Sequence, residues 1–203
     1  MDWSAVQRAR ALSRDKFPRV LKLPVVPDPF GPVIASVDGR TRVLDVGANT
    51  RRLESRIAEK VSGVHYRSLD PDPGFPHDYR DLAEVREPFD VVACLDVIEH
   101  LSVPEVFELI EGIHGVLAPG GRFFVSTPNV HHPVFFWRDC THRTAFRYNE
   151  LAGILYQAGF RDLRVFRVGR LDFKGRITFF VFKPLLKFLD LDYATSILIS
   201  AGK

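Results

Sequence analysis

The fold of this chain is decided by the stretch Arg42-Val-Leu-Asp-Val-Gly-Ala-Asn-Thr-Arg51. A short apolar strand pattern runs into Asp45 and Gly47, and a helical pattern follows at once. In doubly wound α/β folds, a strand that turns tightly into a helix forms a ligand cradle at the carboxyl end of the sheet. A cradle built for pyrophosphate presents backbone N–H groups without a fixed negative charge. Asp45 therefore favours a ligand that carries an ammonium or sulfonium group. Together with the absence of Gly-x-Gly-x-x-Gly, it argues against an NAD-dependent oxidoreductase.

Strand and helix patterns alternate along the rest of the chain. The expected strands span residues 43–46, 64–69, 79–82, 89–95, 122–126, 163–168 and 195–201. The expected helices span residues 3–16, 51–60, 104–117 and 148–158. The segment 89–95 is strongly apolar, which is typical of a central parallel strand buried on both faces. The alternation predicts an α/β fold with a parallel sheet and right-handed crossovers.

Length, charge and cysteine content narrow the class of protein. The 203 residues suit one α/β domain with short additions. The net charge of +3 does not by itself indicate a nucleic-acid partner. Cys94 and Cys140 show neither a disulfide framework nor a metal-binding spacing. The sequence shows no signal peptide and no apolar run long enough to span a bilayer, so a cytoplasmic protein is expected.

Four strings of the sequence resemble the motifs of class I S-adenosylmethionine-dependent methyltransferases. They are Val43-Leu-Asp-Val-Gly, Asp70 after the second strand, Phe89-Asp-Val-Val-Ala-Cys-Leu-Asp-Val-Ile-Glu-His-Leu, and Leu117-Ala-Pro-Gly-Gly-Arg-Phe-Phe-Val-Ser-Thr-Pro-Asn. Asp96-Val-Ile-Glu-His-Leu and the later Asp139-Cys-Thr-His-Arg are similar to the small bacterial branch that includes ubiquinone-type O-methyltransferases. Each motif alone is weakly specific, but the four occur in the family's order. Many members of that branch act on lipids, sugars or small metabolites.

This resemblance implies a Rossmann-like, seven-stranded, mostly parallel sheet with an antiparallel last strand and helices on both faces. It also implies S-adenosylmethionine as the cofactor and an oxygen, less readily a nitrogen, as the methyl acceptor. We expect residues 1–33 to form an N-terminal cap helix and a Pro-rich linker. Residues 34–203 then form the methyltransferase domain, with an apolar insertion at about 170–192. Because the segment after Asp70 is short, the helix expected between strands two and three is missing or reduced to a turn.

The loop after the first strand departs from the family pattern Asp-x-Gly-x-Gly-x-Gly. Asp45 and Gly47 match the pattern and are expected to hold the methionyl end of the cofactor. Asn49 and Arg51 stand at the second and third glycine positions. Asn tolerates a left-handed backbone better than most residues, and Arg51 is expected to reach the methionyl carboxylate as a bidentate clamp. The departures keep a second hypothesis open, a non-catalytic S-adenosylmethionine-binding or scaffold domain.

Acidic residues follow the second expected strand. Asp70 lies near the ~20-residue spacing at which an acid accepts hydrogen bonds from ribose hydroxyls. Its rival is Asp72, in a Pro-rich turn where Asp is common for other reasons. By resemblance, Asp81 and Leu82 meet the adenine amino group and ring. The alternative for Asp81 is a solvated loop acid.

The candidate catalytic residues follow the strand at 89–95. Asp96 ends that strand, so we expect its carboxylate beside the transferring methyl group. Methyl transfer from a sulfonium needs in-line positioning, exclusion of water and, for a hydroxyl acceptor, a base. His100 is the first candidate base, because imidazole titrates near working pH, and His142 is the second. The structural alternative for His100 is a helix-face residue hydrogen-bonded to a neighbouring loop.

A metal-assisted reaction is a further alternative. Small-RNA 2′-O-methyltransferases have a similar acidic-x-x-Glu-His element and a distal histidine that form a carboxylate–imidazole metal site. The corresponding residues here are Asp96, Glu99, His100 and His142. Because the sequence shows neither a second distal histidine at the expected spacing nor an RNA-binding domain, we expect no metal and no nucleic-acid partner.

The segment 173–191 is rich in aromatic and aliphatic residues, interrupted by Lys183 and Lys187. One interpretation is a helix packed between the last two strands, or a face of a homodimer. The other is an apolar lid or a membrane-surface patch, with the lysines at headgroup level. The basic N-terminal helix suits the same membrane face. We therefore expect a small-molecule or lipid-linked acceptor and peripheral membrane contact, in a protein that is a monomer or a homodimer.

Overall fold

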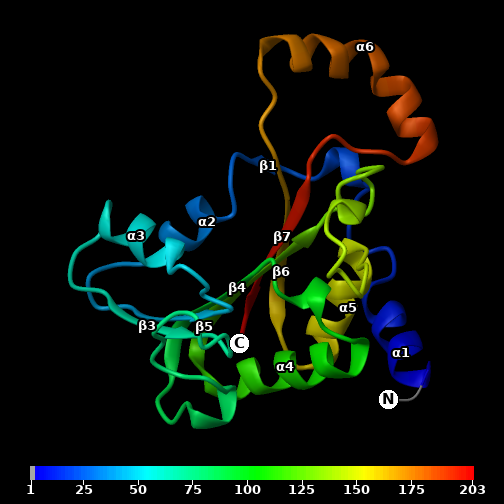
Figure 1. Cartoon of the computed structure of the whole chain (residues 1–203). Coiled ribbons are helices and arrows are strands. Elements are labelled where there is room, and N and C mark those ends of the chain that lie inside the picture. The colour runs from blue at the N-terminus through cyan, green and yellow to red at the C-terminus, as the bar shows by residue number, and fades with distance from the viewer. Residues whose placement is uncertain (1–2) are drawn as a thin grey trace.

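One seven-stranded sheet runs through the protein (Figure 1). Its structure is a computed structural model that describes residues 3–203, so the first two residues of the expected segment 1–33 lie outside it. The strands are β1 (Val25–Val26), β2 (Arg42–Val46), β3 (His65–Leu69), β4 (Phe89–Leu95), β5 (Leu117–Pro128), β6 (Arg161–Val168) and β7 (Ser196–Gly202). They lie in the order β1-β6-β7-β5-β4-β2-β3. β7 is antiparallel to β5 and β6, and the other neighbouring pairs are parallel. The expected sheet with an antiparallel last strand is confirmed.

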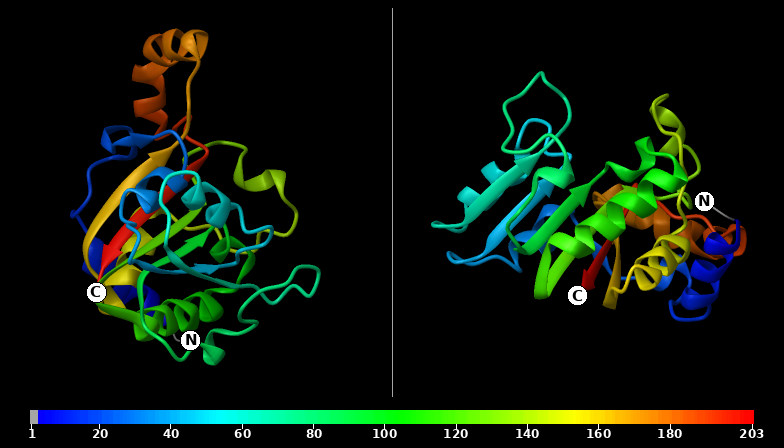
Figure 2. Two further views of the ribbon diagram at one scale, coloured as in Figure 1. Left: turned by 90° about the vertical axis from the view of Figure 1, so that its left-hand side faces the viewer. Right: turned by 90° about the horizontal axis from the view of Figure 1, so that it is seen from below.

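Helices cover both faces of the sheet, as expected (Figures 1 and 2). The α-helices of the described residues are α1 (Trp3–Ser13), α2 (Phe30–Ile34), α3 (Arg52–Ala58), α4 (Val103–Val116), α5 (Tyr148–Gln157) and α6 (Phe173–Leu189). α1, α4 and α5 pack against one face, and α2 and α3 against the other. α1 and α5 pack so closely that a Cβ on Gly153 would lie 2.0 Å from the carbonyl oxygen of Ala9. This contact fixes the N-terminal helix to the body of the fold.

The central strand β4 is apolar because it is buried on both faces. Val92 and Cys94 point into the core under α4 and α5. Val91 and Ala93 point into the core under α2 and α3. All four side chains are fully or almost fully buried. The continuous apolar run in the sequence therefore reflects a parallel strand between two helical layers.

Two expectations about the elements are corrected. The Pro-rich run, expected as a linker, contains β1, which pairs in parallel with β6 at the edge of the sheet and leads into α2. The expected third strand at 79–82 is reduced to a single bridge between Leu69 and Tyr79. Asp81 ends this segment by capping the short 3-10 helix Leu82–Glu84 through the N–H of Ala83. β1 therefore replaces the expected third strand in the count of seven. Within the described residues, no α-helix lies between β3 and β4, as the short segment predicted.

The long helix α6 stands away from the rest of the molecule (Figures 1 and 2). It connects β6 to β7 as expected, but it does not pack on the sheet, and none of its residues is buried. Asp172 caps its start by accepting from the N–H of Gly175 at 2.7 Å. The ring of Phe179 contacts that of Tyr193 with centroids 4.9 Å apart. In the described part of the chain, no helix is both long and apolar enough to cross a membrane.

Candidate active site

The loop between β2 and α3 forms the centre of the site. The N–H groups of Gly47 and Ala48 donate to the carbonyl of Leu69 at 2.8 and 3.2 Å, which ties the loop to the end of β3. Gly47 has a φ of +75°, and a Cβ at this position would lie 2.2 Å from Cγ2 of Val97. The position therefore requires glycine, both for its backbone conformation and for its space.

Asn49 and Arg51 take the left-handed backbone conformation that glycine would have at their two positions in the loop. Their φ angles are +42° and +56°, in the left-handed region that non-glycine residues adopt only at an energetic cost. Both residues therefore adopt a backbone conformation that favours glycine, at the two positions where the family pattern has glycine. The helix α3 begins directly after this second turn.

Three pockets adjoin one another at the carboxyl ends of the central strands. The first, which we call the loop pocket, measures about 350 Å³ and lies between α2, the glycine loop and Asp96. The second, the outer pocket, measures about 400 Å³, shares Gly47 with the loop pocket and is lined by Asp81. The third, the histidine pocket, measures about 380 Å³, shares Asp96 with the loop pocket and is lined by His100 and His142. Gly47 and Asp96 thus join the three pockets in a row.

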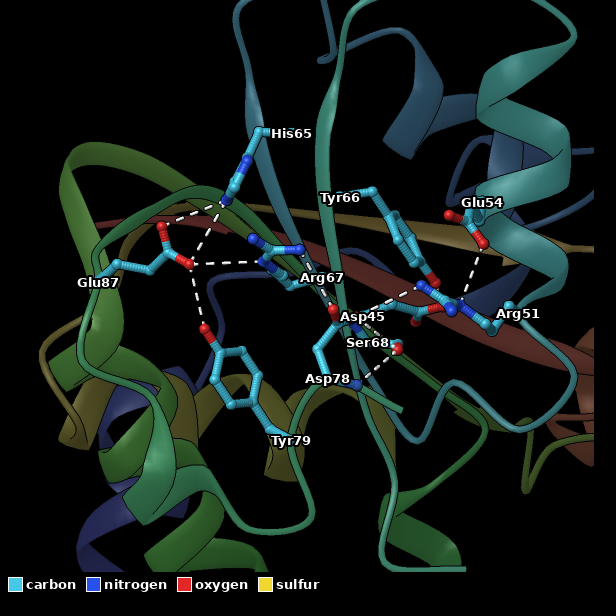
Figure 3. Close-up of polar contacts among 10 residues, drawn as sticks. All are labelled: Asp45, Arg51, Glu54, His65, Tyr66, Arg67, Ser68, Asp78, Tyr79 and Glu87. Carbon is cyan, nitrogen blue, oxygen red and sulfur yellow. Dashed lines mark hydrogen bonds and ion pairs between the residues drawn. The ribbon is translucent and has the colours of Figure 1, made fainter. Parts of the chain in front are cut away.

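Asp45 is the buried acid of the loop pocket. It is 5% exposed, and the hydroxyl of Tyr66 donates to its Oδ2 at 2.6 Å (Figure 3). Burial raises the pKa of Asp45 to about 7, although the hydrogen bond from Tyr66 lowers it. A carboxylate with one such bond keeps acceptor capacity for an ammonium group, and that positive charge would hold the carboxylate ionised. The pocket therefore fits the cationic ligand expected from the sequence.

Arg51 and Arg52 point in different directions. Nε of Arg51 lies 3.0 Å from Glu54, and its Nη2 lies 3.3 Å from Asp78 (Figure 3). Arg52 lines the loop pocket, with its guanidinium carbon 5.7 Å from the ring centre of Phe30. The carboxylate clamp expected of Arg51 would require these ion pairs to exchange, whereas Arg52 already faces the pocket.

Asp70 closes the glycine loop from the end of β3. Its Oδ2 accepts from the N–H of Asn49 at 2.8 Å, and its Oδ1 accepts from the N–H of Asp72 at 2.9 Å. Each carboxylate oxygen can accept a second hydrogen bond. Asp72 instead stabilises its own turn by accepting from the N–H of Gly74 at 2.8 Å. The structure thus ties Asp70, and not Asp72, directly to the glycine loop.

Asp81 and Leu82 both line the outer pocket. Oδ1 of Asp81 accepts from the N–H of Ala83 at 2.8 Å, which holds the turn that presents both side chains. Leu82 packs against α4 at Gly112, where a Cβ would lie 2.6 Å from a Leu82 methyl group. The two residues expected at an adenine ring therefore share one wall of the pocket.

The three expected catalytic residues meet in the histidine pocket. Asp96 follows β4 with a φ of +54°, and its Oδ1 accepts from the hydroxyl of Ser126 at 2.8 Å. Desolvation raises the pKa of Asp96 above its ordinary value. The rings of His100 and His142 lie edge to face, with centroids 4.9 Å apart. Residues from two distant parts of the sequence therefore face one space.

Glu99 is the buried acid of the histidine pocket. It is 1% exposed, and burial, with the nearby Asp96, raises its pKa to about 8. Its Oε2 has no hydrogen-bond partner among the described residues. Its backbone carbonyl accepts from the N–H groups of Arg143 and Thr144 at 2.7 and 3.0 Å. These two bonds hold the segment that carries the second histidine against the turn that carries the first.

Sequence reasoning missed Tyr66, Asp78 and Arg52. Tyr66 was detectable in principle, because β3 pairs with β2 in register and side chains two residues apart on a strand share one face. Asp78 accepts from the N–H and the hydroxyl of Ser68, both at 2.9 Å, as well as from Arg51. No local pattern indicates Asp78, since its position depends on the path of the loop after β3.

Comparison with known proteins identifies relatives of the chain. A family profile described as "Methyltransferase domain" matches residues 6–165. The chain is similar to the ubiquinone biosynthesis O-methyltransferase of Xylella fastidiosa (strain 9a5c), with 36% identity over 107 residues that cover 43% of this chain and 42% of that protein. It is 32% identical over 112 residues to the protein of the same name from Pseudomonas paraeruginosa, covering 47% of each. The chain spans less than half the length of these curated relatives.

Solved structures show a similar fold. A SAM dependent methyltransferase from Archaeoglobus fulgidus superposes with a TM-score of 0.69 at 20% sequence identity. The superposition covers 86% of this chain and 91% of that one. At this identity the likeness confirms the Rossmann-like architecture alone.

Proposed function

The chain belongs to the family of methyltransferase domains, whose cofactor is S-adenosylmethionine, and we propose that it methylates a hydroxyl oxygen of a small-molecule, sugar or lipid-linked acceptor. The row of three pockets carries this proposal. The loop pocket offers Asp45 to an ammonium group and Arg52 to a carboxylate. The outer pocket offers Asp81 and Leu82 to an adenine. The histidine pocket begins at Asp96, where the loop pocket ends, so an acceptor held there adjoins the methionyl end of the cofactor.

The chemistry divides between cofactor and protein. S-adenosylmethionine supplies a methyl group on a sulfonium, so that an oxygen–carbon bond forms, the carbon–sulfur bond breaks with its electron pair remaining on a neutral thioether, and the acceptor proton goes to a base. The protein has to align the acceptor and exclude water. Val97 lines the outer pocket and Pro128 lines the histidine pocket, and both present apolar surface there.

The histidine pocket provides two ways to activate a hydroxyl. An imidazole can take the proton directly through Nε2, which is the role expected of His100, with His142 as the second candidate. The same imidazoles can instead hold a cation that lowers the pKa of a bound hydroxyl. Asp96 lies between the loop pocket and the histidine pocket in either case, and so can take up the proton.

The exposed helix α6 favours an amphipathic or lipid-linked acceptor. Phe173, Phe180 and Phe188 are 77%, 78% and 84% exposed. The helix has no acidic residue and carries four cations, Lys174, Arg176, Lys183 and Lys187. The last three recur at spacings of seven and four, so they share one face of the helix. Exposed apolar side chains interspersed with cations on one unpacked helix suit contact with the interface of an anionic membrane.

Titration calorimetry with S-adenosylhomocysteine tests the cofactor part of the proposal, and NAD serves as the negative control. Transfer of a labelled methyl group from S-adenosylmethionine to simple catechols, with and without a long alkyl chain, tests the acceptor part. We expect binding of S-adenosylhomocysteine and faster methylation of the alkylated catechol. Absence of binding contradicts the whole proposal. Binding without transfer to any hydroxyl acceptor supports the non-catalytic alternative.

A further inference from the structure

We propose that Arg80 is a positioning residue for cofactor binding, because its guanidinium holds the loop that begins with Asp70. Nη1 of Arg80 donates to the carbonyl oxygen of Asp70 at 3.1 Å and to that of Asp72. Its Nη2 donates to the carbonyl oxygen of Phe75 at 2.8 Å. One side chain thus binds three carbonyl groups of the loop 70–75. The inference rests on the proposed function in one respect, the assignment of the cofactor ribose to Asp70.

The composition of the loop explains why it needs a partner. It contains Pro71, Pro73 and Pro76, which have no N–H and therefore donate no backbone hydrogen bond. Residues 71–76 are all exposed, so the loop has no apolar interior of its own. The carbonyl groups of such a loop are bound by water unless donors come from elsewhere in the chain. A guanidinium offers five N–H donors in a fixed plane and so can bind several carbonyls at once.

The backbone of Arg80 is itself fixed on both sides. Its N–H donates to Oε2 of Glu84 at 2.8 Å, and Glu84 belongs to the 3-10 helix Leu82–Glu84. The residue before it, Tyr79, forms the bridge to Leu69 at the end of β3. The guanidinium therefore extends from a segment that is tied to the sheet.

Both backbone polar groups of Asp70 are held by this segment. Its N–H donates to the carbonyl of Tyr79 at 3.2 Å, and its carbonyl accepts from Arg80. The carboxylate of Asp70 then reaches the N–H of Asn49 in the glycine loop. Hydrogen bonds from a charged donor are stronger than those between neutral groups. Removal of the guanidinium should therefore loosen the backbone from which this carboxylate extends.

The contacts of Arg80 favour an indirect role over direct contact with the cofactor. The residue lines the outer pocket together with Pro71 and Asp81. However, the two N–H groups of Nη1 are already used by the carbonyls of Asp70 and Asp72. Arg80 thus acts on a bound ribose through Asp70, and its effect should depend on the ribose hydroxyls.

Titration calorimetry with S-adenosylhomocysteine and its 2′-deoxy analogue tests this dependence. The wild type should bind the analogue about tenfold more weakly, because one hydrogen bond to a charged acceptor is missing. Arg80→Gln should weaken the binding of S-adenosylhomocysteine about tenfold and change that of the analogue little. The ratio of the two affinities should therefore fall towards one. A residue that only stabilised the fold would leave this ratio unchanged.

Two further variants show whether Arg80 acts through Asp70. Effects of residues that share one interaction are not additive. The double variant Asp70→Asn/Arg80→Gln should therefore bind S-adenosylhomocysteine no more weakly than Asp70→Asn does. Arg80→Lys keeps the charge without the planar fork, so it should restore only part of the affinity and of the ratio.

A measurement without any ligand tests the same contact. The N–H of Asn49 is bound to the carboxylate of Asp70. Its hydrogen exchange, followed by NMR, should be about tenfold faster in Arg80→Gln, because local opening of the loop frees this amide. Arg86→Gln is the matched control, since it changes an exposed arginine six residues further along the chain. It should alter neither the exchange rate nor the ratio of affinities. Circular dichroism reports whether each variant is folded.

The outcomes distinguish this inference from the proposed function. If S-adenosylhomocysteine binds and Arg80→Gln weakens both ligands equally, or neither, the inference is overturned and the proposed function stands. Additive effects in the double variant also overturn it. If the wild type binds no S-adenosylhomocysteine, the proposed function is contradicted. In that case faster exchange at Asn49 in Arg80→Gln still supports the hold of Arg80 on Asp70, and unchanged exchange overturns it.

Discussion

The hydroxyl of Tyr66 donates a 2.6 Å hydrogen bond to the carboxylate of Asp45 across the neighbouring strands β3 and β2. This is the only hydrogen bond to the Asp45 carboxylate among those recorded between described residues. The hydrogen bond favours the ionised form of an acid whose pKa burial raises to about 7. The charge state of the loop pocket therefore changes close to neutral pH, and Tyr66 helps to set where it changes.

The affinity for S-adenosylhomocysteine should rise with pH through about 7, because only ionised Asp45 can pair with an ammonium group. One pH unit below its pKa, an acid is about nine-tenths protonated, so the affinity at about pH 6 should be roughly tenfold lower than at about pH 8. Calorimetry at several pH values measures this directly. Asp45→Asn should weaken binding and remove the pH dependence. A wild-type affinity that is flat over this range would contradict the role of Asp45.

Tyr66→Phe should shift the same profile to higher pH. The variant removes the hydrogen bond that lowers the pKa of Asp45, while the ring keeps its packing. Binding near neutral pH should weaken and recover when the pH is raised. Tyr79→Phe is a matched control, because the hydroxyl of Tyr79 bonds to Glu87 outside the loop pocket. If Tyr66→Phe weakens binding equally at every pH, the effect is structural.

Arg52→Gln should weaken S-adenosylhomocysteine binding more than Arg51→Gln does. Arg52 lines the loop pocket, whereas Arg51 is held by Glu54 and Asp78. A hydrogen bond to a charged group contributes about 1.5–3 kcal/mol, but Arg52 is exposed, so we expect the lower end of this range, roughly tenfold. Calorimetry on the two variants gives the comparison. The reverse order would restore the carboxylate clamp expected of Arg51 from the sequence.

Asp70→Asn should weaken binding about ten- to hundred-fold, whereas Asp72→Asn should change it little. Asp70 holds the N–H of Asn49 and has acceptor capacity left for ribose hydroxyls. Asp72 stabilises only its own turn through Gly74. Because Asp70→Asn also disturbs the loop, thermal melts should accompany the calorimetry. Equal losses in both variants would contradict the assignment of the ribose to Asp70.

The exposed phenylalanines of α6, together with its cations, should attach the protein to anionic vesicles. Burial of one large apolar side chain contributes about 1.5–3 kcal/mol, so Phe180→Ser/Phe188→Ser should abolish co-sedimentation. Lys183→Gln/Lys187→Gln should weaken it and reduce its dependence on salt. Neutral vesicles are the control. A wild-type protein that stays in solution and forms a stable dimer by light scattering would instead make α6 a homodimer face.

The predictions made from the sequence agree with the structure where interactions between residues close in the chain determine the element. The strands, the helices and the glycine loop depend on periodicity and turn chemistry over a few residues, and the expected sheet with its antiparallel last strand is confirmed. The errors lie where a segment depends on distant partners. β1 forms because β6 offers an open edge, and the Pro-rich composition around it indicated only an extended chain.

For the site, the sequence by itself determined which residues lie at the carboxyl ends of the strands. Asp45, Gly47 and Asp96 follow buried strands, and His100 lies one turn beyond Asp96. Their proximity needs only the order of elements in a parallel sheet.

Only the tertiary structure decided which side chains meet. His142 reaches His100 because the carbonyl of Glu99 binds the two N–H groups that follow His142. Arg52, and not Arg51, lines the loop pocket because Glu54 and Asp78 hold the guanidinium of its neighbour. Local sequence patterns describe how one segment folds, whereas the partner of a side chain depends on which distant segment packs against it.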